Sequence, residues 1–210
     1  MTKSEVLNTI ERERLVPVIR TATTEAAKTA LEFLEAGDLR VAEITLTIPN
    51  AADLIADSVP RHPDLLIGAG TVLSAEQAES CIDAGARFVV SPILAEDVIA
   101  ICRKRGVVVF GAGLTPTEIY AAWQAGADAV KVFPCNAVGG ASFIKSMKSV
   151  FPMVRLIPTG GVTAENLREH LEAGAFAAGA GSDLLPSSLI EPGGSDAINN
   201  RIRAYIDALA

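Results

Sequence analysis

Apolar runs alternate with amphipathic segments along the whole chain. Four runs rich in aliphatic residues each lead into a turn and then a segment with helical periodicity, at residues 16–20, 65–72, 107–113 and 155–161. Between them one phrase recurs four times, a helical segment that ends in Ala-Gly and is followed by a strand, as in "LEAGDLRVAEITL" from residue 34 and "WQAGADAVKVFP" from residue 123. Continuous apolar runs joined by helices are typical of a parallel sheet covered by helices. The pattern therefore predicts eight strands that alternate with helices.

Local signals mark the ends of the expected helices. A hydroxyl residue that can accept a hydrogen bond from an exposed backbone N–H group precedes the helical segments, at Thr23, Ser74, Thr115 and Thr163. A glycine follows the helical segment in each of the four repeats, and we expect it to take the left-handed conformation that closes a helix, at Gly37, Gly85, Gly126 and Gly174. These signals bound each helix independently of the hydrophobic pattern.

Eight strand–helix units favour a closed α/β fold, the (βα)8 or TIM barrel, over an open doubly wound sheet, which is the alternative. We expect residues 1–210 to form one barrel domain. An extra N-terminal helix at 2–14 is expected to close the bottom of the barrel, and a loop at 186–196 to precede a last helix at 197–210. No linker or low-complexity tract interrupts the series.

Composition and charge narrow the function classes. The net charge is −7 with no basic run, which argues against a nucleic-acid partner. No apolar run reaches membrane-spanning length and the first residues carry charges where a signal peptide is apolar, so a cytoplasmic protein is expected. Three scattered cysteines form no CxxC pair and indicate reduced thiols rather than a disulfide framework. The two histidines lack ligand spacing, and we expect no metal site.

Two charged residues lie in strands that are otherwise apolar. Alternate residues of a barrel strand face the helices or the interior. In residues 41–47 the apolar set is Ala42, Ile44 and Leu46, so Glu43 is expected to point inward. The same alternation in residues 129–133 places Lys131 inside the barrel. A buried ammonium is costly unless it is paired or loses its proton, so Lys131 and Glu43 form either a structural ion pair or a chemical site.

The expected C-terminal mouth of the barrel collects further polar groups. Arg20 and Thr71 fall at the ends of the first and third strands. Two glycine-rich turns, at 158–163 and 179–184, follow the seventh and eighth strands, where this fold usually binds phosphate. The alternative is that these segments are only tight turns. Their paired placement at the mouth favours an anion site.

The motifs together resemble a known family. They are "VAEITL" at 41–46, "GAGTVL" at 68–73, "VVSP" at 89–92, "VKVFP" at 130–134 and "PTGGV" at 158–162. In this order they are similar to the 2-keto-3-deoxy-6-phosphogluconate (KDPG) and 4-hydroxy-2-oxoglutarate (KHG) aldolases. The resemblance implies a class I aldolase that needs no metal or other cofactor, forms a homotrimer, and cleaves a phosphorylated 2-keto acid to pyruvate and glyceraldehyde 3-phosphate.

The resemblance also implies roles for individual residues. Lys131 would form the Schiff base and Glu43 would be the general acid/base, both catalytic. Other residues would hold the carboxylate end of the substrate or shape its pocket, namely Arg20, Thr47, Thr71, Pro92 and Phe133. The phosphate would be bound by Gly160, Gly161, Gly181 and Ser182.

Some positions depart from the family pattern. Thr47 stands where many members have a substrate-binding arginine, and residues 91–93 and 111–113 differ from the usual proline–glycine turns. The phosphogalactonate (KDPGal) branch also lacks that arginine, so both the gluconate and galactonate epimers stay open as substrates. The alternatives are a KHG aldolase, a phosphosugar isomerase or synthase, and a non-catalytic sugar-phosphate binder. An isomerase or synthase would have no need of a buried amine, and in a non-catalytic binder Lys131 would only neutralise an acid.

Overall fold

Eight parallel strands form the centre of the molecule. The computed structural model describes residues 1–190 and 196–210. The strands are β1 (Leu15–Ile19), β2 (Val41–Thr45), β3 (Leu66–Gly70), β4 (Phe88–Val90), β5 (Val108–Ala112), β6 (Ala129–Val132), β7 (Leu156–Pro158) and β8 (Ala178–Ala180). Neighbours in sequence are neighbours in the sheet, β8 pairs with β1, and a parallel bridge between Thr159 and Gly179 joins the β7 and β8 edges. The sheet therefore closes, which confirms the predicted TIM barrel and excludes the open-sheet alternative.

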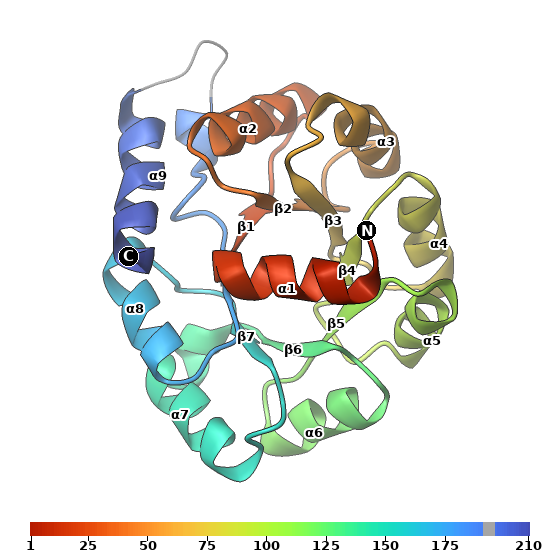
Figure 1. Ribbon diagram of the computed structural model, residues 1–210, viewed down its shortest axis with the longest axis vertical. Coiled ribbons are helices and arrows are strands. Elements are labelled where there is room, and N and C mark those ends of the chain that lie inside the picture. Colours follow the sequence, from red (N-terminus) through yellow and green to blue (C-terminus); the bar gives the residue numbers. More distant parts are fainter. Residues whose placement is uncertain (191–195) are drawn as a thin grey trace.

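Helices surround this barrel in the order of the chain (Figure 1). The outer helices are α2 (Thr24–Ala36), α3 (Ala51–Arg61), α4 (Ala75–Asp83), α5 (Glu96–Arg105), α6 (Pro116–Gln124), α7 (Ala141–Val150), α8 (Ala164–Glu172) and α9 (Asp196–Leu209). Short 3₁₀ helices follow β6 at Cys135–Val138 and β8 at Ser187–Leu189. The predicted loop at 186–196 therefore contains a 3₁₀ turn, and its residues 191–195 lie outside the described residues.

The extra helix α1 (Lys3–Glu13) closes the N-terminal end of the barrel, as predicted. Val6 and Ile10 of α1 are buried against the first residues of several strands, among them Val16, Val41 and Leu66. Figure 1 shows α1 lying across the centre of the ring. Phe88 and Phe110 belong to the same buried cluster, and their rings stack with centroids 5.6 Å apart. This end of the interior is a packed core, so the inside of the barrel is accessible only from the other end.

The inward–outward alternation of the strands follows the prediction. Ala42 and Ile44 belong to the core between sheet and helices, as do Val130 and Val132. Val41 and Ala129 instead pack inside the barrel. Because alternate residues share a side, Glu43 and Lys131 also face the interior.

Most of the predicted helix ends are confirmed, with one correction. Thr23, Ser74 and Thr115 accept backbone hydrogen bonds at the starts of α2, α4 and α6. Gly85, Gly126 and Gly174 take positive φ angles after their helices. The prediction for Gly37 is wrong, because its φ is −85° and the next residue, Asp38, takes the left-handed conformation with φ 63°.

Gly37 serves a different purpose from the other three glycines. Helix α2 continues to Ala36, directly before Gly37, so the chain leaves the helix one position later than in the other repeats. A Cβ at Gly37 would overlap Cγ2 of Ile202 on α9. The glycine therefore permits close packing of α2 against α9, a contact that no local pattern around residue 37 indicates.

Candidate active site

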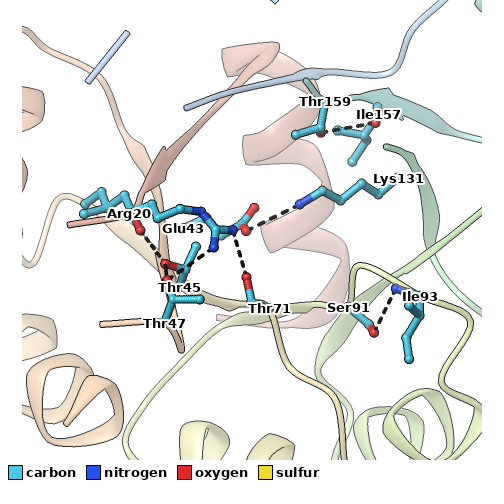
Figure 2. A network of polar contacts seen from close by, with 11 residues as sticks. Arg20, Glu43, Thr45, Thr47, Thr71, Ser91, Ile93, Lys131, Ile157 and Thr159 are labelled. Atoms are coloured by element: carbon cyan, nitrogen blue, oxygen red, sulfur yellow. Dashed lines mark hydrogen bonds and ion pairs between the residues drawn. The ribbon is translucent and has the colours of Figure 1, made fainter. Parts of the chain in front are cut away.

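The two charged residues of the strands meet inside the barrel. Glu43 on β2 and Lys131 on β6 come from opposite sides of the ring, and Nζ of Lys131 lies 3.7 Å from Oε1 of Glu43. The two residues are 2% and 5% exposed. Within the described part of the chain, Oε1 of Glu43 has no hydrogen-bond partner. The amine and the carboxylate therefore approach each other without being locked in a hydrogen bond (Figure 2).

A glycine on the adjacent strand makes room for the carboxylate. Glu43 pairs with Gly68 in the β2–β3 register, and Gly70 follows two residues along the same face. A Cβ at Gly70 would overlap Oε1 of Glu43. The "GAG" sequence therefore shapes the space around the general acid/base candidate, a role that the sequence analysis missed.

Arg20 is held by threonines at the mouth. Its guanidinium donates to Oγ1 of Thr47 at 3.3 Å and to Oγ1 of Thr71 at 3.1 Å (Figure 2). Thr45 lies 2.8 Å from Thr47 and donates to the carbonyl of Ile19, which fixes the hydroxyl chain behind the arginine. No carboxylate pairs with Arg20 among residues 1–190 and 196–210. Its charge is thus positioned by neutral groups and stays available to an anion.

The turns after β7 and β8 form another part of the rim, next to the end of β1. Gly160 and Gly161 have φ angles of 88° and 75°, a conformation that favours glycine. Asn166 of α8 holds this turn, because its Nδ2 donates to the carbonyl of Gly161 at 2.8 Å and its Oδ1 accepts from the backbone of Thr163 at 2.9 Å. Gly181 and Ser182 face the same space. Exposed backbone N–H groups near a helix N-terminus are suited to binding an anion.

One cavity of about 460 Å³ unites these features. Its lining includes the predicted residues Arg20, Thr71, Pro92, Lys131, Phe133, Gly160, Gly161, Gly181 and Ser182. Glu43 and Thr47 are not in the lining, but each contacts a residue that is. A depression of about 670 Å³ at the other end of the barrel is larger, but it lacks a buried pair of titratable groups. The chemistry therefore points to the smaller cavity.

The cavity also has lining residues to which the sequence analysis gave no individual role in the site. They are Val18, Thr159, Val162, Thr163, Asp183, Leu185 and Ser187. Thr159 is 8% exposed and lies within the "PTGG" motif, so the motif could have predicted its place in the cavity lining. Ser187 lies in the 3₁₀ turn beyond the glycine motifs, where no pattern marks it.

The cysteines and possible metal ligands of the described residues do not indicate a second reactive site. Burial raises the pKa of Cys135, just beyond the "KVFP" motif, to about 11, so this thiol is inert at neutral pH. All three cysteines are buried, and none of them is in a disulfide, in agreement with the prediction of reduced thiols. Within the described ranges, no group of three or more His, Cys, Asp or Glu is placed to hold a metal ion. No helix of the described residues is long and apolar enough to cross a membrane.

Comparisons with known proteins agree on one family. The family described as "KDPG and KHG aldolase" matches residues 6–201. The 2-dehydro-3-deoxy-phosphogluconate aldolase of Treponema pallidum is 35% identical over 188 residues, which cover 90% of each chain. The 2-dehydro-3-deoxy-6-phosphogalactonate aldolase of Escherichia coli K12 is 36% identical over 172 residues, 81% of this chain and 83% of the relative.

A solved structure extends the agreement to three dimensions. The KDPG aldolase of Legionella pneumophila, with pyruvate captured as a covalent carbinolamine intermediate, is 28% identical with a TM-score of 0.81, covering 97% of this chain and 95% of that one. The match of the family therefore spans the eight strands and the turns of the candidate site. The chain belongs to the KDPG and KHG aldolase family.

Proposed function

We propose that the protein is a class I aldolase that reversibly cleaves a 2-keto-3-deoxy-6-phospho sugar acid, KDPG or KDPGal, to pyruvate and glyceraldehyde 3-phosphate. The observation that carries the proposal is the buried Lys131–Glu43 pair, 3.7 Å apart beneath a cavity that is lined by an arginine and by glycine turns. The relatives named above act on phosphorylated acids of both epimers. The glycine turns favour these substrates over the shorter, unphosphorylated KHG.

Lys131 supplies the nucleophile in this proposal. Its neutral amine attacks the C2 ketone, and loss of water from the carbinolamine gives a protonated imine. The hydroxyl at C4 then loses its proton, the C3–C4 bond breaks, and its electron pair moves to the imine nitrogen to give an enamine. Protonation of C3 and hydrolysis of the imine release pyruvate and restore the amine. No metal or organic cofactor is required, because the imine itself takes up the electrons.

Glu43 moves the protons of these steps. Its Oε1, which has no hydrogen-bond partner among the described residues, lies 3.7 Å from the amine on the opposite strand, so it can receive a proton and return it at successive stages. The Legionella relative, in which pyruvate forms a covalent carbinolamine, supports the same first step here.

The ends of the cavity suit the two anionic ends of the substrate. Arg20 and Thr71 would hold the carboxylate, with Thr47 supporting Arg20 through its hydroxyl. Arg20 thus supplies from β1 the positive charge that many relatives place at position 47 of β2. Gly160, Gly161, Gly181 and Ser182 would bind the phosphate, while Pro92 and Phe133 shape the space between. The Phe133 ring also lies 5.5 Å from Nζ of Lys131.

We further propose that the enzyme works in the cytoplasm as a homotrimer, as the family resemblance implies. Leu73 and Ile93 support an interface between copies, because they follow the neighbouring strands β3 and β4 and are 49% and 51% exposed. Large apolar side chains exposed in this way are typical of contact surfaces.

Replacement of the amine tests the function. Lys131→Met should lower the rate of pyruvate formation from KDPG or KDPGal at least about a thousandfold, because the variant cannot form an imine. Binding of inorganic phosphate, measured by calorimetry, should persist because the glycine turns are unchanged. Lys145→Met, at an exposed position of α7, is the control and should keep wild-type turnover. Full pyruvate formation by Lys131→Met would contradict the imine mechanism on Lys131, whereas no pyruvate formation by the wild type would favour an isomerase or synthase.

A further inference from the structure

One buried tyrosine joins the two turns that face the proposed phosphate site. Tyr205 on α9 is 1% exposed, and its hydroxyl lies 3.0 Å from the carbonyl oxygen of Val162 and 2.8 Å from Oδ2 of Asp183. Val162 directly follows Gly160 and Gly161, and Asp183 directly follows Ser182. Both oxygens are acceptors, so the single hydroxyl proton is shared between the turn after β7 and the turn after β8.

The hydrogen bond from Tyr205 matters for the phosphate site because Asp183 carries a carboxylate next to it. Asp183 lines the cavity, and a free carboxylate beside an anion-binding turn would repel a phosphate. Its two oxygens are engaged from α9, Oδ2 by Tyr205 and Oδ1 by Arg201 at 3.4 Å. Arg201 also donates to the backbone carbonyl of Asp183 at 2.7 Å. The acid is therefore bound on the side that faces α9.

Tyr205 keeps the proton that it donates. Burial and the hydrogen bond to Asp183 raise the pKa of Tyr205, so the hydroxyl keeps its proton and remains a donor at neutral pH. Without the hydroxyl, a buried carbonyl and a carboxylate would face each other with no donor between them. Both turns would have to move to satisfy these acceptors.

We propose that Tyr205 is a positioning residue for phosphate recognition, which holds the two glycine turns in register and keeps the Asp183 carboxylate turned toward α9. The inference rests on the proposed function, in which these turns bind the phosphate of the substrate. Tyr205 does not touch the reacting carbons, so its effect should fall on binding of the phosphate end and spare the chemistry at Lys131.

The test compares substrates with and without a phosphate. For Tyr205→Phe we expect the KM for KDPG or KDPGal to rise about tenfold, the size of a lost hydrogen bond to a charged group, with kcat within about twofold. The KM for KHG, which has no phosphate, should not change. Tyr120→Phe removes the same atom from a tyrosine whose ring stacks on Phe151, and it should match the wild type with both substrates.

Two further variants separate positioning from general damage. In the Tyr205→Phe background, Asp183→Asn removes the repelling charge and should restore part of the affinity for phosphorylated substrate. Arg201→Gln removes the partner of the other carboxylate oxygen, at a partly exposed position. It should also raise the KM for the phosphorylated substrate but not the KM for KHG, by a smaller factor than Tyr205→Phe. This variant keeps the test available if Tyr205→Phe does not fold.

The outcomes also distinguish this inference from the proposed function. An equal rise in KM for both substrates, or no change in either, would overturn the positioning role. Absence of turnover in the wild type would overturn the aldolase instead. In that case calorimetry with inorganic phosphate decides, because Tyr205→Phe should still weaken phosphate binding about tenfold, and an unchanged affinity would refute the inference.

Discussion

At the scale of single residues, the site keeps polar groups that a purely structural core would not. Oε1 of Glu43 is buried and lacks a hydrogen bond within the described residues. Buried acceptors are nearly always satisfied, and the exceptions gather at functional sites. A structural ion pair would be expected at hydrogen-bond distance, whereas Lys131 and Glu43 stand 3.7 Å apart. This geometry suits groups that must exchange protons with a substrate.

Sequence patterns placed these two side chains correctly, and missed the residue that accommodates them. Inward orientation of Glu43 and Lys131 follows from the two-residue period of a strand, so it could be read from each strand alone. The space that Glu43 occupies depends on Gly70, which belongs to another strand and is brought there by the β2–β3 register. Such a requirement has no local signature.

Gly70→Ala tests whether this space matters for catalysis. The added Cβ would overlap Oε1 of Glu43, so the carboxylate must turn away from Lys131. General acid/base catalysis contributes about 10²–10⁴ in rate, and we expect kcat to fall about a hundredfold. Steady-state kinetics with KDPG or KDPGal would measure this. Gly111→Ala is the control, because its methyl group would meet only helix-side groups, such as Cβ of Ala122 at 3.3 Å. Wild-type kcat in Gly70→Ala would show that the position of Glu43 is not critical.

At the scale of elements, sequence signals predicted helix ends correctly where the helix end depends only on neighbouring residues in the chain. Thr23, Ser74 and Thr115 cap their helices because a cap needs only the first helical turn. The prediction for Gly37 failed because a glycine is needed there for close packing against Ile202 on α9 and not for the helix end. The link from Tyr205 of α9 to the turns after β7 and β8 was equally invisible, since it joins residues 22 and 43 positions apart.

Helix α8 carries a histidine that should make stability depend on pH. His170 is 4% exposed, its Nδ1 has no hydrogen-bond partner in the described residues, and burial lowers its pKa below 6.5 against a smaller opposing effect of Glu169. The unfolded chain therefore binds this proton more readily than the folded one. The histidine should have no effect on stability well above pH 6.5. Below that pH its destabilising effect should grow until the folded protein also takes the proton, and then stay constant.

Urea unfolding at several pH values measures this effect. The wild type should lose more unfolding free energy than His170→Gln when the pH falls from about 7.5 to 5.5, because glutamine does not titrate in that range. The difference between the two pH profiles is the contribution of the histidine. Parallel profiles would show that His170 takes up its proton equally in the folded and unfolded states.

At the scale of the whole molecule, the closed barrel turns dispersed residues into one site. Arg20, Glu43, Thr71 and Lys131 come from or directly follow four different strands, and closure brings them to the same mouth. The repeat of strand and helix predicted this arrangement, because every parallel strand ends at the same side of the barrel. The overall charge of −7 gave no hint of an anionic substrate, since the cations that matter are few and local.

Substrate identity is the part that sequence patterns left open, for a physical reason. KDPG and KDPGal differ in the configuration of one hydroxyl, and discrimination between them rests on contacts made across the cavity. Thr47 was read as the loss of a positive charge, whereas the structure shows that Arg20 from β1 reaches the Thr47 hydroxyl. This contact joins two neighbouring strands and could be seen only once they were side by side.

The central claim is that Lys131 forms an imine with a 2-keto acid. The most direct measurement is to mix the protein with pyruvate, add borohydride, and determine the intact mass and the modified peptide. The account predicts one reduced pyruvyl adduct, located on Lys131 and absent from Lys131→Met. No adduct on the folded protein, or an adduct on another lysine such as Lys148, would contradict it.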